Sequence, residues 1–467
     1  MTLQFLLDAP VADRTQEAVR VWHGEPDSEP ATGGVRIVRG EAPQPLVAVV
    51  GLGHAGLPNA IALRRAGFRI VGIDTSSSRL NSIRSGRVEL GGVERGELRD
   101  GLGHDEFVLT GSVEAAHAAD VVLICVPVVL DAQRRPNLDT LARACEGVVH
   151  NARAGQTLVL TSSSHVGSTR ELLVEPLAQR GLRAGEDVFV AFSPERADPG
   201  VPAHEQLRVP RLVGAASDAC YAHASQLLRH ICGSLRRVSS PEAAEMTKLY
   251  ESTFRAVNIA LAFEMADACA GHRLDPVEIT DAAASKPFGF MAHYPSAGVG
   301  GHGVRVDPHC LLHQQRERGR PALLAEEAMR TLAARPRRVA ARAQELLVRS
   351  GQRLRDTRVV VVGAAYKPGV SDCSESPAVE IISSLLAEGA HVDYHDPLVP
   401  SLWVDGEELH GIDPDPRRDA SGFGPEDYDL AILVTLQPGY DYGWLRRCAQ
   451  VLDCTYRERT GRRCIVP

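Results

Sequence analysis

A glycine-rich turn between a strand and a helix constrains the fold of this chain more than any other feature. Residues 49–56 read VVGLGHAG, so the three glycines follow the spacing G-x-G-x-x-G. In such a turn the first glycine permits the tight bend, the second lets a pyrophosphate approach the backbone, and the third allows close packing of helix on strand. The N-terminus of the helix then faces the phosphate charge. The turn predicts a dinucleotide-binding βαβ unit that opens at Gly51.

The residues around this turn favour NAD as the cofactor. The apolar run Leu46–Val50 is typical of a buried parallel strand, a helix is predicted over Asn59–Ala66, and Arg69–Ile73 forms the next strand. Asp74 follows that strand, where a carboxylate accepts hydrogen bonds from the adenosine ribose and repels the 2′-phosphate of NADP. The residues that we expect to bind the cofactor are Gly51, Gly53, His54, Ala55, Gly56, Asp74, Arg79, Val126, Pro127 and Ser163.

Strands and helices alternate in both halves of the chain, which predicts a doubly wound sheet in each. Further strands of the first sheet are expected at 119–126, 157–160 and 188–192. Strands of the second sheet are expected at 358–362, 391–394, 430–434 and 451–452.

A long helix is predicted between the two sheets, from Pro241 to Gly271, with a cap at Ser239 or Ser240 and no breaker inside. Helical segments continue to about Arg335. We therefore expect an α/β fold in which two Rossmann-like doubly wound domains are joined by a central long-helix segment. The expected division is an N-terminal extension at 1–44, a cofactor domain at 45–238, the central segment at 239–335 and a C-terminal domain at 336–467.

Bulk composition excludes several classes of function. The net charge of -8 lacks the basic excess of a nucleic-acid binder, and no apolar run is long enough to span a bilayer. The 10 cysteines show no metal-type spacing, so we expect reduced thiols in a cytoplasmic protein that binds no metal. Among the 51 basic residues the lysines are Lys248, Lys286 and Lys367, and all of them lie in the motifs described next.

Six motifs form an ordered series along the chain. They are VVGLGHAGLP at 49–58, SPERADPG at 193–200, AEMTKLYESTFRAVN at 244–258, KPFGF at 286–290, GVGGHGVRVDP at 298–308 and AYKP at 365–368. Together they resemble the UDP-glucose/GDP-mannose 6-dehydrogenase family of nucleotide-sugar dehydrogenases, over about residues 45 to 460. The resemblance implies NAD as cofactor, a UDP-, GDP- or dTDP-linked sugar held by the C-terminal domain, and a homodimer formed through the central segment.

The chain departs from the family at the residue that carries the second half of the family reaction. Members oxidise a primary alcohol twice to a uronic acid, and a cysteine after Gly-Gly-His captures the aldehyde for the second oxidation. This chain has Gly303 there, nothing adjacent replaces the thiol, and Cys310 lies farther along. Further departures from the family pattern occur at Val128, Thr161, Ser252 and Ser374.

The remaining polar residues suit a first oxidation. Lys248 and Ser252 lie one helical turn apart on one face, where an ammonium would stabilise an alkoxide as hydride leaves. Asp307 is expected to accept the proton, directly or through water, and Glu195 is a second candidate base. Structural roles remain open for these residues, namely an exposed helix cation, a helix cap and a loop salt bridge. The expected catalytic residues are Lys248, Asp307, Glu195 and Ser252, and the expected substrate contacts are Arg255, Asn258, Lys286, Phe288, Phe290, Gly300, Gly301, Tyr366 and Lys367.

Three functions are open on these residues. We favour transient oxidation of a sugar hydroxyl followed by dehydration or epimerisation, with the hydride returned, so that the reaction is redox-neutral and no uronic acid forms. The altered pocket and the arginine bias favour a sugar of specialised metabolism for it, such as an antibiotic precursor. The alternatives are a one-step or ordinary NDP-sugar 6-dehydrogenase, and a non-catalytic relative that binds a nucleotide sugar or a partner subunit.

Overall fold

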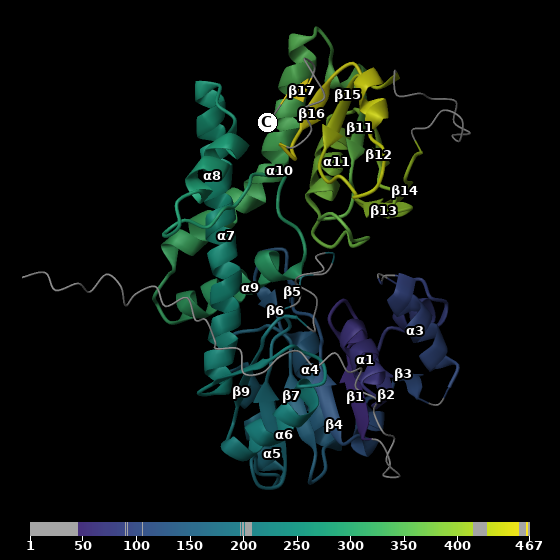
Figure 1. Ribbon diagram of the computed structural model, residues 1–467, viewed down its shortest axis with the longest axis vertical. Coiled ribbons are helices and arrows are strands. Elements are labelled where there is room, and N and C mark those ends of the chain that lie inside the picture. The colour runs from purple at the N-terminus through teal and green to yellow at the C-terminus, as the bar shows by residue number, and fades with distance from the viewer. Residues whose placement is uncertain are drawn as a thin grey trace, which may run out of the picture. The chain divides into compact units, whose positions relative to one another are not determined.

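The computed structural model describes residues 45–88, 90, 92–104, 106–196, 198, 200, 208–413, 427–456 and 464–465. The extension expected at 1–44 lies outside these residues. Figure 1 shows a sheet near each end of the described chain, with helices around each sheet, and long helices that come between them in sequence. The predicted α/β fold, with two Rossmann-like sheets and a central long-helix segment, is confirmed.

The N-terminal sheet has the strand order β10-β9-β8-β7-β4-β1-β2-β3, and its neighbours pair in parallel except β8 and β9. Its strands are β1 (Leu46–Val50), β2 (Arg69–Ile73), β3 (Phe107–Thr110), β4 (Val121–Ile124), β7 (Thr157–Leu160), β8 (Phe189–Phe192), β9 (Arg211–Ala215) and β10 (Leu235–Val238). The strand order reverses at β1, which lies between β2 and β4. Ligands of such sheets bind beyond the carboxyl ends of the strands at this point.

Helices and short elements surround this sheet. They are α1 (Gly56–Arg65), α2 (Ser77–Arg84), α3 (Gly92–Leu102), η1 (Val113–Ala118), the hairpin β5 (Val129–Leu130) and β6 (Pro136–Asn137), α4 (Asp139–Asn151), η2 (Arg170–Val174), α5 (Glu175–Gln179) and α6 (Asp218–Leu228). Alternate residues of β1 pack in two separate apolar clusters, Ala48 and Val50 in one, Val47 and Val49 in the other. Both faces of the strand are therefore covered, which explains its continuous apolar run.

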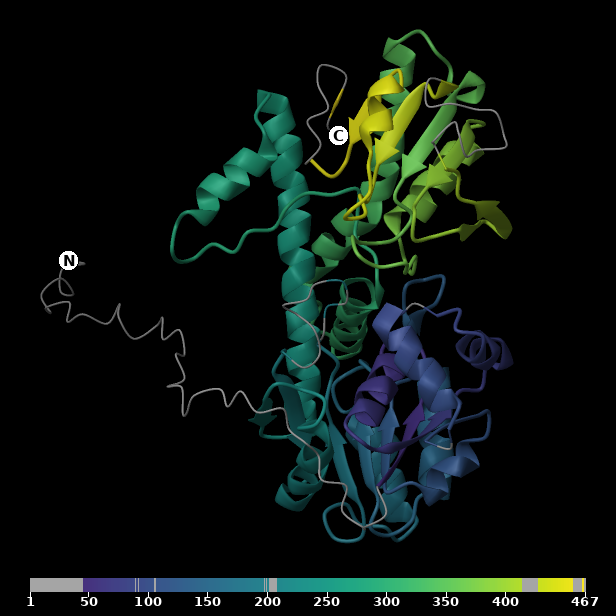
Figure 2. The ribbon, with the colours of Figure 1, turned by 45° about the vertical axis from the view of Figure 1, so that its right-hand side comes forward.

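The central helices begin with α7 (Pro241–His272), which both ribbon views show as one unbroken helix (Figure 2). Ser240 caps it by accepting a hydrogen bond from the Ala243 backbone N–H at 3.2 Å, and Pro241 occupies the first turn. The other central helices are α8 (Pro276–Ala284), α9 (His302–Glu317) and α10 (Leu323–Arg349). Both α9 and α10 pack against α7.

The helix α10 continues past Arg335, where we expected the helical segment to end. Its interior contains Pro336, and a proline inside a helix costs about 3 kcal/mol. Leu332, Val339 and Leu347 are fully buried along the same helix, and burial stabilises each such side chain by about 1.5–3 kcal/mol. The packing of these side chains outweighs the cost of the proline.

The C-terminal sheet is parallel and has the order β12-β11-β15-β16-β17. Its elements are η4 (Leu354–Asp356), β11 (Arg358–Val362), α11 (Pro377–Ala387), β12 (His391–His395), β15 (Leu430–Leu433), η6 (Gly443–Arg447), β16 (Val451–Asp453) and β17 (Cys464–Ile465), with the antiparallel pair β13 (Ser401–Val404) and β14 (Glu407–His410) at its side. In the part of the chain that the structure describes, no helix has both the length and the apolar character that crossing a bilayer requires.

Candidate active site

The glycine turn after β1 has the geometry that a dinucleotide needs. Gly51 has a φ of 87°, and a Cβ there would lie 2.9 Å from the Cys125 carbonyl oxygen. A Cβ on Gly56 would lie 1.8 Å from the Gly51 carbonyl oxygen, so no side chain fits at either position. A Cβ on Gly53 would meet nothing within 4 Å. The middle glycine thus leaves its backbone open to a phosphate group at the start of α1.

Asp74 and Arg79 hold the same turn from β2 and α2. Asp74 accepts hydrogen bonds from the backbone N–H groups of Leu52 and Ser76, each at 2.9 Å. Arg79 donates through Nε to the Leu52 carbonyl oxygen at 2.8 Å. Each carboxylate oxygen has a second lone pair, so Asp74 can also accept from a ribose hydroxyl. The geometry of the turn and the position of Asp74 beside it are those of an NAD site.

His54 connects the turn to the C-terminal half of the chain. Its Nε2 lies 3.2 Å from Oδ2 of Asp372, and its ring centroid lies 5.9 Å from that of His302 at the start of α9. Although burial acts in the opposite direction, the hydrogen bond and charge of His54, with hydrogen bonds from Ser374, lower the pKa of Asp372 to about 2. Asp372 therefore carries a full negative charge beside the glycine turn at neutral pH.

Three predicted catalytic residues meet between α7 and α9. Asp307 is buried, with 4% of its surface exposed, and accepts a hydrogen bond from Ser252 Oγ at 2.7 Å. Lys248 Nζ lies 3.9 Å from the same carboxylate oxygen and donates to the Glu195 backbone carbonyl at 3.0 Å. Burial raises the pKa of Asp307, and the Lys248 charge, the Ser252 hydroxyl and the Ser163 hydroxyl oppose this rise. Ser163, which we expected at the cofactor, therefore contacts this cluster.

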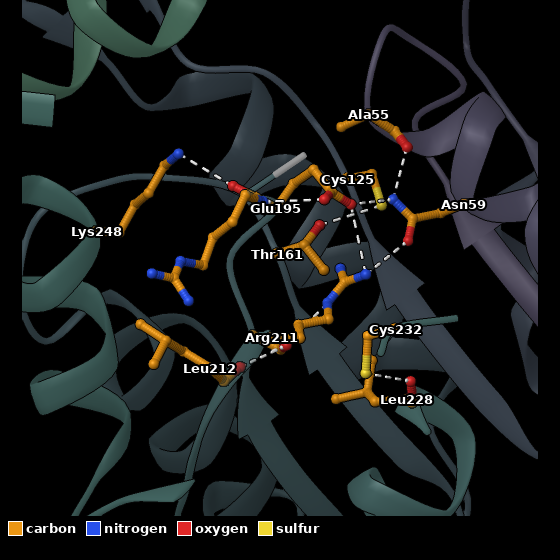
Figure 3. A network of polar contacts seen from close by, with 12 residues as sticks. Ala55, Asn59, Cys125, Thr161, Glu195, Arg211, Leu212, Leu228, Cys232 and Lys248 are labelled. Atoms are coloured by element: carbon orange, nitrogen blue, oxygen red, sulfur yellow. Dashed lines mark hydrogen bonds and ion pairs between the residues drawn. The ribbon is translucent and has the colours of Figure 1, made fainter. Parts of the chain in front are cut away.

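The carboxylate of Glu195 points toward Asn59 and Arg211, while Lys248 lies on the side of its backbone carbonyl, as Figure 3 shows. Its Oε2 accepts a hydrogen bond from Asn59 Nδ2 at 2.9 Å and lies 3.4 Å from Nη1 of Arg211. Arg211 is 3% exposed and donates to the Asn59 side-chain oxygen at 3.0 Å. The carboxylate of Glu195 thus links α1 to β9, and its backbone carbonyl accepts from Lys248. Sequence reasoning missed Asn59 and Arg211, because neither lies in a motif with a chemical signature.

Gly303 lies in the first turn of α9, beside the Asp307 cluster. A Cβ on it would lie 3.9 Å from Oδ2 of Asp307 and 4.0 Å from Oγ of Ser252, with nothing nearer. Cys310 does not reach this place, because it packs in the apolar core of the N-terminal domain. Burial raises the pKa of the Cys310 thiol to about 12, so it stays protonated at neutral pH.

A second glycine turn follows β11 and is built in the same way as the first. Gly363 has a φ of 94°, and a Cβ there would lie 2.0 Å from the Thr435 carbonyl oxygen. Asp396 accepts hydrogen bonds from the N–H groups of Ala364 and Ala365 at 2.9 and 3.0 Å. Sequence reasoning missed Asp396, although an aspartate shortly after the second strand of a βαβ unit was a readable signal, as at Asp74.

Some predicted substrate residues meet beside this second turn. Tyr366 fills the space next to two glycines, since a Cβ on Gly300 or Gly301 would lie 2.4 or 3.0 Å from its side chain. Burial raises the pKa of Tyr366 to about 12, and the Arg255 charge acts in the opposite direction. Lys367 forms an ion pair with Asp198.

Other predicted substrate residues have no described contact with either turn. Lys286 Nζ lies 4.9 Å from the ring centroid of Phe288, and Phe288 and Phe290 are exposed. Asn258 donates to the Phe254 carbonyl of its own helix at 2.8 Å. Two residues predicted at the cofactor lie by the first turn: Val126 contacts Gly51, and the neighbouring Pro127 is exposed.

Known families and proteins match most of this chain. The UDP-glucose/GDP-mannose dehydrogenase family matches in three parts: the NAD binding domain at 46–232, the central domain at 242–331 and the UDP binding domain at 360–454. A UDP-N-acetyl-D-mannosamine dehydrogenase of Pyrococcus horikoshii is 32% identical over 357 residues, which cover 76% of this chain and 84% of that protein. A UDP-N-acetyl-D-glucosamine 6-dehydrogenase of Pseudomonas aeruginosa is 28% identical over 373 residues, with coverage of 79% and 86%.

A solved structure has the same fold. The UDP-D-ManNAc dehydrogenase of Pyrococcus horikoshii superposes with a TM-score of 0.78 at 27% identity, over 90% of this chain and 98% of that chain.

The favoured expectation of a redox-neutral dehydratase or epimerase is wrong. The relatives that cover most of this chain are named as dehydrogenases, one of them as a 6-dehydrogenase, and they agree better with the alternative of an NDP-sugar 6-dehydrogenase. The error came from Gly303, because we took a glycine at this position of the motif to exclude net oxidation. Hydride transfer depends on the cofactor turn and on a base, and neither requires that thiol. The sugar of specialised metabolism, inferred from the same pocket, loses its support.

Several findings agree with one another. They are the two glycine turns, the buried Asp307 cluster, the three matching domains, and a relative that is 32% identical and matched over 84% of its length. This chain therefore belongs to the UDP-glucose/GDP-mannose dehydrogenase family, and its N-terminal domain is the NAD-binding domain of that family.

Proposed function

We propose that this protein is a UDP-sugar 6-dehydrogenase, which uses NAD to oxidise the C6 hydroxyl of a UDP-linked 2-acetamido sugar. The observation that carries the proposal is the buried contact of Asp307 with Ser252 at 2.7 Å and Lys248 at 3.9 Å. The names of the relatives, which act on UDP-N-acetylmannosamine and UDP-N-acetylglucosamine, support the substrate class.

Asp307 serves as the base of the first oxidation. Its pKa is raised by burial, so the carboxylate holds a proton more readily than an exposed aspartate does. Lys248 places an ammonium beside it, which stabilises the alkoxide that forms at C6. Ser252 donates to Asp307 and fixes the orientation of the carboxylate. NAD supplies the hydride acceptor for C6.

The proposed cofactor residues are those of the first turn and its neighbours. Gly51, Gly53, His54, Ala55 and Gly56 would hold the pyrophosphate, and the geometry at the three glycines supports this role. We propose that five further residues contact the ribose and nicotinamide of NAD: Asp74, Arg79, Val126, Pro127 and Ser163.

The UDP end of the substrate is assigned to the second turn. Asp396 holds this turn by accepting hydrogen bonds from the N–H groups of Ala364 and Ala365, as Asp74 holds the first turn through Leu52. The turn and the adjoining Tyr366 are the place that we propose for the UDP group. The match to a UDP binding domain at 360–454 supports this assignment. The further proposed substrate contacts are Arg255, Asn258, Lys286, Phe288, Phe290, Gly300, Gly301 and Lys367.

We also propose that the protein lacks the thiol of the family reaction. Gly303 stands where the family motif places the cysteine, and Cys310 is buried in the core with its pKa raised. Glu195 is assigned a positioning role instead of a base, since its carboxylate is held by Asn59 and Arg211.

A homodimer formed through α7 is the proposed assembly. The exposed apolar residues of α7 recur at helical spacing along one stripe: Met246, Tyr250, Phe254, Leu261 and Met265. An exposed stripe of this kind is typical of an interface. Residues 45–238, 239–335 and 336–467 are the proposed cofactor, dimerisation and nucleotide-sugar domains. The thiols of Cys125, Cys145, Cys220, Cys232, Cys269, Cys310 and Cys373 are free, which supports a reducing, cytoplasmic location.

The test is an assay of the purified chain with UDP-N-acetylmannosamine, UDP-N-acetylglucosamine and UDP-glucose. We expect NADH to accumulate with an N-acetylated sugar and the product mass to be that of the uronic acid. GDP-mannose serves as the control for the nucleotide. Absence of NADH with every UDP-sugar, while the protein still binds NAD, would contradict the proposal.

A further inference from the structure

We propose that the second oxidation by this protein proceeds through the hydrate of the C6 aldehyde, with a water molecule bound in the space beside Gly303 and Asp307 acting as the base again. The inference rests on the proposed function, because it needs an enzyme that oxidises C6 to an acid. It assigns a second catalytic step to residues already placed for the first.

The space beside Gly303 has a polar lining and admits a heavy atom at the position of a Cβ. The two nearest atoms to a Cβ on this residue would be carboxylate and hydroxyl oxygens, at 3.9 Å from Asp307 and 4.0 Å from Ser252. A water oxygen that bonds to both has to lie about 1 Å nearer to them than this Cβ position, and the two oxygens, 2.7 Å apart, can share one such partner. Asp307 accepts from such a water, and the Ser252 oxygen, which donates to Asp307, still has lone pairs for a water proton.

Thiol chemistry has no candidate nucleophile in the part of the chain that the structure describes. The cysteines whose side chains are described are buried except Cys373. Burial raises the pKa of Cys125, Cys310 and Cys373 to about 12 in each case, so each stays a protonated thiol at neutral pH. Cys125 also accepts a hydrogen bond from Thr161, and Cys310 packs in the apolar core. Water is the nucleophile that remains.

The hydrate route balances without any further reagent. Water adds to the aldehyde: its oxygen forms a bond to C6 and one proton passes to the aldehyde oxygen, giving a geminal diol. Asp307 then takes a proton from one diol hydroxyl, and C6 loses a hydride to a second NAD⁺, which leaves the carboxylic acid and NADH. The proton on Asp307 passes to solvent before the next turnover. The diol carbon again carries a hydrogen and a hydroxyl, so it presents the same groups as the alcohol did.

A family-type cysteine would occupy this space. Gly303 has no positive φ, and a Cβ meets nothing closer than 3.9 Å, so residue 303 accepts a side chain without backbone strain. A methyl group there would displace a water that bridges Asp307 and Ser252. Substitution at 303 therefore separates the second oxidation from the first.

The experiment uses the full chain with UDP-N-acetylmannosamine and, separately, the corresponding C6 aldehyde. For the unmodified protein we expect two NADH per sugar, the mass of the free chain after an acid quench during turnover, and no loss of rate with iodoacetamide. A sugar mass on the chain, or loss of aldehyde oxidation on alkylation, overturns the hydrate route. One NADH per sugar with accumulating aldehyde also overturns it and contradicts the expected acid product, but it leaves the proposed oxidation of the C6 hydroxyl by NAD intact. Absence of NADH from the alcohol overturns both.

Variants at residue 303 sharpen the test. Gly303→Ala should slow aldehyde oxidation by about tenfold or more relative to alcohol oxidation, so that NADH per sugar falls from two toward one. Gly303→Cys should gain a sugar adduct that survives the quench and sensitivity to alkylation. Cys310→Ala, whose thiol lies in the core, should keep two NADH per sugar. An equal loss of both oxidations in Gly303→Ala refutes the water site.

Discussion

Replacing Asp307 by asparagine removes one charge from the candidate site and keeps its shape. The amide oxygen can still accept the hydrogen bond that Ser252 donates at 2.7 Å, and the side-chain volume is nearly unchanged. What disappears is the group that takes the proton from C6. The loss of a general base typically lowers the rate by about 10²–10⁴-fold, which corresponds to about 3–5 kcal/mol of transition-state stabilisation.

The stability of this variant has an expected sign as well. Burial raises the folded-state pKa of Asp307, so the protonated form is the one that folding favours. The contribution of Asp307 to the free energy of unfolding is fully present below the unfolded-state pKa. It is lost as pH rises through the raised folded-state pKa. At neutral pH the ionised carboxylate therefore opposes folding, and the asparagine variant should melt no lower than the original. The original should gain stability relative to the variant on acidification.

The assay compares kcat/KM for UDP-N-acetylmannosamine, the NADH dissociation constant by fluorescence, and thermal unfolding. We expect kcat/KM to fall by about 10²–10⁴-fold. The NADH dissociation constant should stay the same, and the unfolding temperature should not fall. Asp218→Asn is the matched control, because that side chain is 91% exposed on α6, where it pairs with Arg237, and its loss should leave kcat/KM and NADH binding unchanged. A loss in kcat/KM below about tenfold, with the fold intact, would refute the role of Asp307 as the base.

Three further predictions concern pH, cofactor choice and assembly. Ser252→Ala removes a hydrogen bond that lowers the pKa of Asp307, so the acid limb of the pH–rate profile should move to higher pH; an unmoved limb would refute the contact. Asp74→Asn should weaken NAD binding by about 1.5–3 kcal/mol, measured by titration, and should reduce the preference for NAD over NADP. Equal NAD affinity in this variant would place the ribose elsewhere. Leu261→Glu puts a charge in the exposed stripe of α7 and should convert a dimer to a monomer by light scattering, with an unchanged mass as the contrary result.

The candidate site shows why Gly303 misled the functional inference. A motif read along the chain gives the identity of one residue, and the absence of a thiol pointed to a reaction without net oxidation. The structure places Gly303 beside the oxygens of Asp307 and Ser252, which come from two helices. The chemistry of this place depends on those neighbours, and their distance from residue 303 cannot be obtained from the spacing of the motif.

Local physics explains what the sequence by itself determined. The turn at Gly51 is readable because only glycine tolerates its positive φ and close contacts, and β1 is readable because a strand buried on both faces must be apolar throughout. The start of α7 follows from Ser240 and Pro241, which act within one helical turn. These signals lie within a few residues of the structure that they specify.

Only the tertiary structure decided which side chains meet. Asp307 finds Lys248 and Ser252 because α9 packs on α7, and Glu195 turns to Arg211 because β8 and β9 are neighbours in the sheet. A carboxylate at a given position in the chain is a base, an anchor or a cap according to its neighbours. Those neighbours are fixed by the packing of helices and strands that lie far apart in sequence. A local sequence pattern therefore cannot predict which side chains become neighbours.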